Sequence, residues 1–161
     1  MRAHRISIHD DNGQAFVELA LVLPMLILLV VGAAEIGGLA YADIEVSNAA
    51  RAGVAYAMQS HTKAADNPAI RNAAKQDAPD LHGLVVDDAT LACYCETSAG
   101  VTTSLAGCGP TQANTTICLS PSVIVIYVRV DTHAPIDTVF HLPAIPNTVT
   151  LRGTAIMRVE F

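Results

Sequence analysis

A single acidic residue stands at the start of a long apolar segment. The chain reads Gly13-Gln14-Ala15-Phe16-Val17-Glu18, and an uncharged apolar run follows from Leu19 to Ala34. A carboxylate inside a membrane span costs roughly 2.5–3.5 kcal/mol even on insertion scales, so it is usually retained for a partner. If the chain were cut after Gly13, the new α-amine of Gln14 would lie one helical turn before Glu18 and could neutralise it. This feature predicts a processed subunit that is stored in a membrane.

The composition fits one anchor and one small domain. Of 161 residues, 52% are apolar and 15% are charged, and this length does not suggest two domains. The segment from Phe16 to Gly38 would form about 34 Å of helix, enough to cross a bilayer with some tilt. The net charge of −6 argues against a nucleic-acid partner and against a polybasic membrane-surface patch.

The flanking charges predict the orientation of this span. Arg2 and Arg5 precede it, and the first basic residue after it is Arg51. The positive-inside rule therefore places the N-terminus in the cytoplasm of a single-pass inner-membrane protein. The rest of the chain would then lie outside the membrane, where disulfides persist.

Three segments are expected, and together they predict an α+β fold. Residues 1–13 form a short polar leader, and residues 14–60 form one long helix that is embedded in lipid over about 16–38 and amphipathic afterwards. Residues 61–161 form a small, β-rich extracytoplasmic domain with an antiparallel sheet. The amphipathic half carries an apolar stripe with helical spacing: Leu39, Ala42, Val46, Ala49, Gly53 and Tyr56.

Within the third segment, the patterns predict one short helix and several strands. Asn67-Pro68 is typical of an N-cap and first helical residue, so a helix is expected over about 68–77. The strongest strand is expected over 123–130, and the alternation over 148–161 predicts a last strand. Weaker strand candidates are 84–86, 90–96 and 115–119. The prolines at 135, 143 and 146 predict an irregular loop before the last strand.

Three explanations of the N-terminal segment remain open from the residues alone. A plain uncleaved signal anchor, carrying a membrane-tethered binding or adhesion domain, would need nothing from Gly13 or Glu18. A secretory signal could end at Ala40-Tyr41-Ala42, but Glu35 intervenes before that site. Cleavage after Gly13 uses the leader, the glycine, the acid and the span together.

The motif Gly-x-x-x-x-Glu before an apolar helix resembles the processing signal of type IV pilins and pseudopilins. Over residues 15–24, AFVELALVLP, and again over residues 48–57, NAARAGVAYA, the chain is similar to the TadE/TadF-type minor pseudopilins of the tight-adherence (Flp pilus) secretion system. The closing stretch 153–160 also fits that family. The resemblance is specific over about 13–57 and only generic through the middle of the chain.

The resemblance implies roles for particular residues. Gly13 would be the last leader residue, Gln14 the mature N-terminus after a prepilin peptidase has acted, and Glu18 the carboxylate used in assembly. Major Flp pilins have Tyr directly after this glutamate, whereas this chain has Leu19, which favours a minor subunit. The implied partners are inner-membrane lipid, the prepilin peptidase, other pilin or pseudopilin subunits and the pilus assembly machinery. Pro24 would bend the helix, either as an ordinary kink or as a site of local unwinding during extraction from lipid.

The cysteines predict disulfides rather than a metal site. Cys93 and Cys95 would share one face of a strand, and two bridges to Cys108 and Cys118 are expected, with the pairing open. A four-thiolate zinc site and free thiols are the alternatives, but this spacing is not a standard zinc pattern. No nucleophile elbow, phosphate-binding loop or zinc-protease motif is present in the sequence. We therefore expect no enzyme activity, no cofactor and no metal.

Overall fold

The computed structural model describes residues 11–105, 118–119, 121–139 and 146–159, although the side chains of residues 11 and 12 are not described. The chain forms two compact units, one ending at Gly38 and the other beginning at Leu39. The helix α1 (Asp11–Ala57) provides all of the described part of the first unit and the opening of the second. The expected long helix is present, beginning and ending three residues earlier than the predicted range 14–60.

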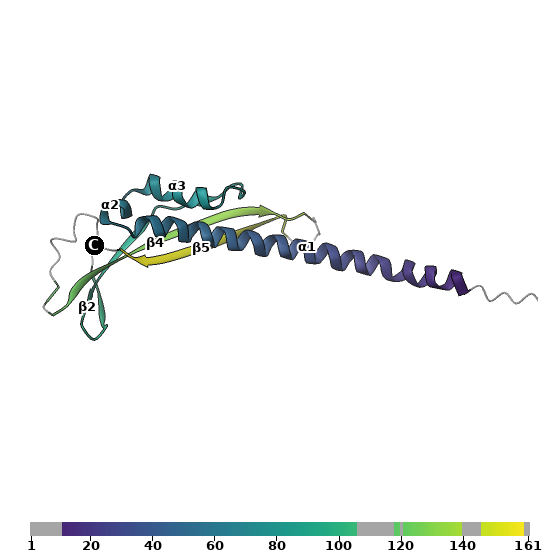
Figure 1. Cartoon of the computed structure of the whole chain (residues 1–161), viewed down its shortest axis with the longest axis horizontal. Coiled ribbons are helices and arrows are strands. Elements are labelled where there is room, and N and C mark those ends of the chain that lie inside the picture. Colours follow the sequence, from purple (N-terminus) through teal and green to yellow (C-terminus); the bar gives the residue numbers. More distant parts are fainter. Residues whose placement is uncertain (1–10, 106–117, 120, 140–145, 160–161) are drawn as a thin grey trace, which may run out of the picture. The chain divides into compact units, whose positions relative to one another are not determined.

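Two shorter helices follow α1 in the second unit (Figure 1). Ser60 caps α2 (His61–Ala64), and its hydroxyl accepts a hydrogen bond from the Lys63 amide at 3.3 Å. A third helix, α3 (Asn67–Asp77), ends before Pro79, as the sequence predicts.

The predicted cap of α3 was wrong by one residue. Asp66 is the N-cap, because its carboxylate accepts from the Ala69 amide at 3.1 Å. Asn67 lies inside the helix, and its side-chain oxygen accepts from the Ala89 amide at 2.9 Å. Asp and Asn are equally good caps, so the long-range contact of Asn67 decides which residue takes the role.

All strands of the sheet are antiparallel, which confirms the α+β class with a small antiparallel sheet (Figure 1). The strands are β1 (Val85–Val86), β2 (Thr90–Glu96), β3 (Thr102–Leu105), β4 (Val123–Asp137) and β5 (Thr148–Arg158). The central strand β4 pairs with β2 and β1 along one edge and with β5 along the other, while β3 extends the sheet beyond β2.

One predicted strand is absent where it is described, and one observed strand was not predicted. The candidate 115–119 is not a strand where it is described, at Cys118 and Leu119, and its other residues lie outside the described part of the chain. The strand between β2 and β4 in the chain is instead the polar segment Thr102–Leu105, β3. It is joined to β2 by a tight turn in which Gly100 has φ 77° and the Thr97 amide donates to the Val101 carbonyl at 2.9 Å. A positive φ of this kind favours glycine.

Pro135 lies inside β4 rather than in the predicted loop. Hydrogen-bonded and non-hydrogen-bonded pairs alternate along an antiparallel ladder, and the Val159 amide donates to the Ile126 carbonyl at 2.8 Å. Even-numbered residues of β4 therefore bond to β5, whereas Pro135 faces the opposite edge. Because β1 begins only at Val85, opposite His133, no ladder bond is lost to the missing N–H of the proline. Of the other two prolines, Pro146 lies in the connection before β5, and Pro143 lies outside the described residues.

The core of the second unit lies between the end of α1 and one face of the sheet. The predicted helix stripe is confirmed, since Ala42, Val46, Ala49 and Gly53 are buried and Leu39 and Tyr56 are half-buried. The alternation predicted for the last strand is also confirmed, with its even-numbered residues exposed. The sheet contributes a matching set of buried side chains: Cys93, Ile126, Val128, Val130, Ala134, Ala155 and Val159.

Candidate functional site: the exposed apolar helix

The first unit buries none of its described apolar side chains fully, and most of them are exposed. Phe16, Leu21 and Leu28 are 74%, 73% and 71% exposed. The apolar residues occupy every position of several successive turns rather than one stripe, and a helix that is apolar all round is normally surrounded by lipid or by protein. Among the described residues one helix, Gly13–Ala57, is long and apolar enough to cross a membrane.

Glu18 lies on the exposed surface of this helix, one turn after Gln14. The Gln14 side-chain amide donates to the Glu18 carboxylate with 3.4 Å between Nε2 and Oε1. This contact shows that positions 14 and 18 share one helix face, as the i,i+4 spacing requires. A positively charged side chain at position 14 would therefore lie beside the carboxylate.

Gly13 lies in the first turn of α1, since the helix begins at Asp11. No neighbouring atom lies within 4 Å of the position that a Cβ would occupy on Gly13. Gly13 is itself exposed, but a protease that needs an extended substrate would first have to unwind this turn.

Pro24 lies in the interior of α1, and the helix continues on both sides of it. A proline has no N–H, so the Ala20 carbonyl loses its usual i+4 donor. Ala20 is exposed, so its carbonyl lies on the surface of the helix. The helix is therefore weaker at this turn than at the turns before and after it.

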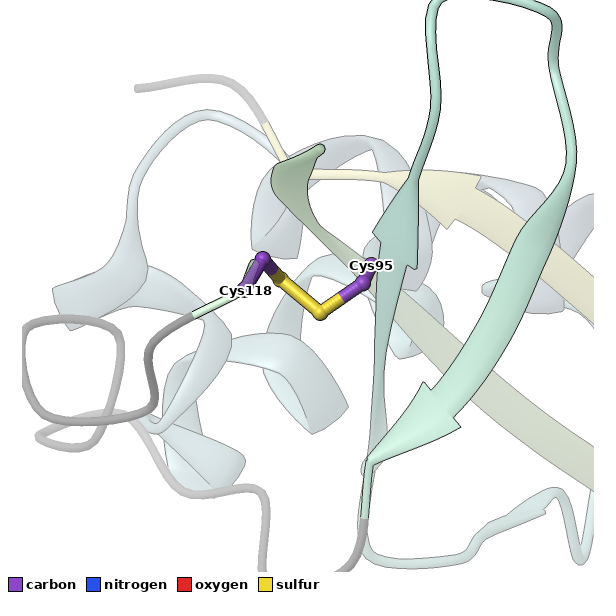
Figure 2. Close-up of a disulfide and its surroundings, with 2 residues drawn as sticks. All are labelled: Cys95 and Cys118. Carbon is purple, nitrogen blue, oxygen red and sulfur yellow. A yellow bond between two sulfur atoms is a disulfide. The ribbon is translucent and has the colours of Figure 1, made fainter. Parts of the chain in front are cut away.

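The second unit holds a disulfide between Cys95, in β2, and Cys118 (Figure 2). The two Cα atoms lie 5.6 Å apart, at the usual separation for a bridge. Cys93 is also disulfide-bonded, whereas Cys108 lies outside the described residues. The Cys95–Cys118 bond fixes the end of β2 to the chain just before β4.

The outer face of the sheet, opposite α1, carries charged and hydroxyl side chains. Arg129 donates to Asp131 with Nε 2.8 Å from Oδ2, and the Thr154 hydroxyl donates to the same carboxylate at 2.5 Å. The hydrogen bond from Arg129 lowers the pKa of Asp131, and the same bond raises the pKa of Arg129. Both side chains are partly exposed, and their mutual neutralisation leaves neither available as an acid or base.

A shallow cavity of about 520 Å³ lies on the same outer face. Its lining includes Tyr94 and Tyr127, whose rings meet edge to face with centroids 5.7 Å apart. In the described part of the chain, no group of three or more His, Cys, Asp or Glu side chains is arranged to hold a metal ion. The lining contains no nucleophile with an adjacent base, so the exposed helix is the stronger candidate site.

One contact of the second unit was not predicted from the sequence. The hydroxyl of Thr132, in β4, donates to the carbonyl of Val46, in α1, at 2.8 Å. Gly153, in β5, lies beside this bond, and a Cβ there would be 2.6 Å from the Val46 oxygen. A glycine in a strand interior often marks a close backbone approach, and this was the available signal.

Residues 13–65 match the family of TadE-like proteins. The match confirms the family resemblance of the N-terminal segment and covers the candidate site, including Gly13, Gln14, Glu18 and Pro24. No match to the chain was found among curated proteins or among solved structures.

Proposed function

We propose that this chain, whose residues 13–65 match the TadE-like family, is a minor pilin-like subunit for assembly of a tight-adherence pilus. It would be held in the inner membrane by a single span, with the N-terminus in the cytoplasm and the sheet domain outside. Arg2 and Arg5 before the span, with no further basic residue until Arg51, support this orientation. The Cys95–Cys118 disulfide supports an extracytoplasmic location for the second unit.

The observation that carries the proposal is the position of Glu18. It is the only acidic residue between Gly13 and Ala34, on a helix whose apolar side chains are exposed all round. A lone carboxylate at the edge of a span is costly unless a partner neutralises it. If the partner arises only when the leader is cleaved, Glu18 would be neutralised only in the mature protein.

Cleavage after Gly13 would supply that partner. The new α-amine would belong to Gln14, whose side chain already lies 3.4 Å from the Glu18 carboxylate. The amine could reach the carboxylate of its own chain or that of a neighbouring subunit. In either case the ion pair replaces an unpaired charge. Only the pair with a neighbouring subunit requires the bundle, so that pair would favour transfer of the helix out of lipid.

The assembled state would bury the apolar surface of the first unit. Helices that leave lipid gain little from the hydrophobic effect, because lipid tails are already apolar, so their association depends on packing and on polar contacts between helices. Under this proposal Glu18 supplies the polar contact and the surrounding residues supply the packing. Pro24, where the helix lacks one backbone bond, would be the turn at which α1 bends or unwinds on extraction.

The proposal is tested by the mature N-terminus of the protein purified from its native membrane. Intact mass and N-terminal sequencing, with and without prepilin peptidase, should give a peptidase-dependent start at Gln14. The variant Gly13→Leu should retain the leader, while the matched variant Gly38→Leu, in the same helix, should be processed normally. A start at Met1 in the presence of peptidase would instead support a membrane-tethered binding domain, and a start at Asp43 would indicate a secreted soluble protein.

A further inference from the structure

One long edge of the sheet has no partner among the described residues. The 11-residue strand β5 pairs with β4 on one side only. The amide of Val159 donates to Ile126 and the amide of Thr138 donates to Asn147, at 2.8 and 2.9 Å. Both bonds belong to the β4–β5 register, and hydrogen-bonded pairs alternate along the ladder. The odd-numbered residues of β5 therefore bond to β4, and the even-numbered residues direct their backbone N–H and C=O groups to the free edge.

The residues of this free edge are all exposed. The six are Thr148, Thr150, Arg152, Thr154, Ile156 and Arg158. No backbone hydrogen bond reaches them from any other described part of the chain. An open row of strand donors and acceptors is a template for a further strand.

Two of the six residues on this edge are arginines, and none of the six is acidic. The edge has two arginines, although the whole chain has a net charge of −6. Arg158 is partly neutralised by Glu96, at 3.5 Å, whereas Arg152 makes no ion pair with any described residue. The described hydroxyls of Thr148 and Thr154 already donate to Asp137 and Asp131. Arg152 is thus the side chain on this edge that lacks a counter-ion.

We propose that the free edge of β5 binds an extended segment of another polypeptide, with acidic side chains at alternate positions, as an added strand. The backbones of Thr150, Arg152, Thr154 and Ile156 would supply the ladder bonds that give affinity. Arg152 would pair with a carboxylate of the added strand, which would favour acidic segments over basic ones. This surface belongs to the second unit and does not involve the helix face around Glu18, so its failure would leave the proposed function unaffected.

The test measures binding of short, fluorescently labelled peptides to the full chain in detergent micelles. One capped peptide alternates glutamate with valine, and a second carries lysine in place of each glutamate. By fluorescence anisotropy we expect the glutamate peptide to bind about tenfold more tightly at low salt. The variant Arg152→Gln should reduce this preference to about threefold or less. Without the arginine, the glutamate and lysine peptides would be held by the same backbone bonds, which do not distinguish them.

The backbone contribution is tested separately. Thr150→Pro removes one N–H from the free edge, and Thr150→Val keeps it. We expect the proline variant to lose about tenfold in affinity and the valine variant to bind as the wild type does. If the proline variant fails to fold, the N–H donors can instead be removed from the peptide. A glutamate peptide that is methylated on alternate backbone amides should not bind.

Three outcomes would overturn the proposal. The first is equal binding of the glutamate and lysine peptides, and the second is full binding of the methylated peptide. The third is a dimer of the full chain without peptide, abolished by Thr150→Pro, which would assign the edge to a second copy of this chain.

Discussion

The hydroxyl of Thr132 donates a hydrogen bond to the backbone carbonyl of Val46, with 2.8 Å between the two oxygens. The bond joins the middle of β4 to the part of α1 that belongs to the second unit. Both residues are buried, and a helix carbonyl can accept a second hydrogen bond in addition to the one within the helix. This polar contact therefore fixes where the helix lies along the sheet, which an apolar stripe alone would leave free to slide.

Gly153→Ala should destabilise the second unit by about 1–3 kcal/mol, as overpacking of a dense contact usually does. A Cβ at this position would lie 2.6 Å from the Val46 oxygen and 2.7 Å from the Thr132 hydroxyl. Neither atom can withdraw without breaking the bond between them. Chemical unfolding of the full chain in micelles gives the free energy of unfolding. The control is Gly38→Ala, where no atom lies within 4 Å of the added carbon; an equal loss in both variants would contradict the role of Gly153.

Thr132→Val should lower the free energy of unfolding by about 0.5–1.5 kcal/mol, the usual net contribution of one intramolecular hydrogen bond. Valine has nearly the same shape as threonine, so the change removes the hydroxyl and little else. Thr132→Ser keeps the donor to Val46 and removes one methyl group. If the hydrogen bond stabilises the contact, hydrogen exchange around Val46 should be faster in the valine variant than in the serine variant. The opposite order would mean that packing of the methyl group matters more.

The elements that were predicted correctly are those with a periodic sequence signal. The stripe through Ala42, Val46 and Ala49 repeats with helical spacing, and β5 alternates throughout, so local pattern alone indicates which face is buried. The segment that holds Gly13 and Glu18 also carries a family signal in its sequence, whereas the roles of the two residues stay predictions.

The elements that were missed depend on contacts between distant parts of the chain. The strand β3 is short and polar and pairs only with β2, so it has little hydrophobic signal of its own. Pro135 was assigned to a loop because its tolerance in β4 depends on where β1 begins. That strand begins at Val85, opposite His133, and this long-range pairing is invisible in the sequence around Pro135. The bond between Thr132 and Val46 likewise joins residues 86 positions apart.

Replacing Cys95 and Cys118 together by Ser should lower the free energy of unfolding by about 2–4 kcal/mol. The bridge joins residues 23 positions apart and limits the unfolded chain more than it changes the native contacts. Unfolding is measured under oxidising conditions, and a mass measurement after thiol alkylation verifies that the bridge involving Cys93 is still intact. A loss below about 0.5 kcal/mol would mean that the remaining bridge already restrains this region.

The interaction between Asp131 and Arg129 should make the stability of the second unit depend on pH in the acid range. The hydrogen bond from Arg129 lowers the pKa of Asp131 in the folded protein. The stabilisation is therefore fully present above the unfolded pKa, about 3.9, and is lost as the pH falls through the lower folded value. Asp131→Asn should be less stable than wild type at pH 7, and the difference should shrink below about pH 4. Asp88→Asn, which alters the exposed pair with Arg71, is the surface control; a pH-independent difference for Asp131→Asn would contradict the linkage.

Glu18→Gln should separate membrane insertion from assembly. Without the carboxylate the helix is less costly to place in lipid, so the variant should be inserted and processed as well as the wild type or better. It cannot form an ion pair with the α-amine of Gln14, and incorporation into assembled pili or adherence of cells should fall by about tenfold or more, the effect expected when a buried amine is left without its counter-ion. Fractionation measures insertion, N-terminal sequencing measures processing, and immunoblotting of sheared pili measures incorporation. Glu35→Gln removes the other acid between Gly13 and Gly38 and should leave assembly intact. Normal assembly with Glu18→Gln would show that the charge is dispensable and that the apolar surface of the helix suffices.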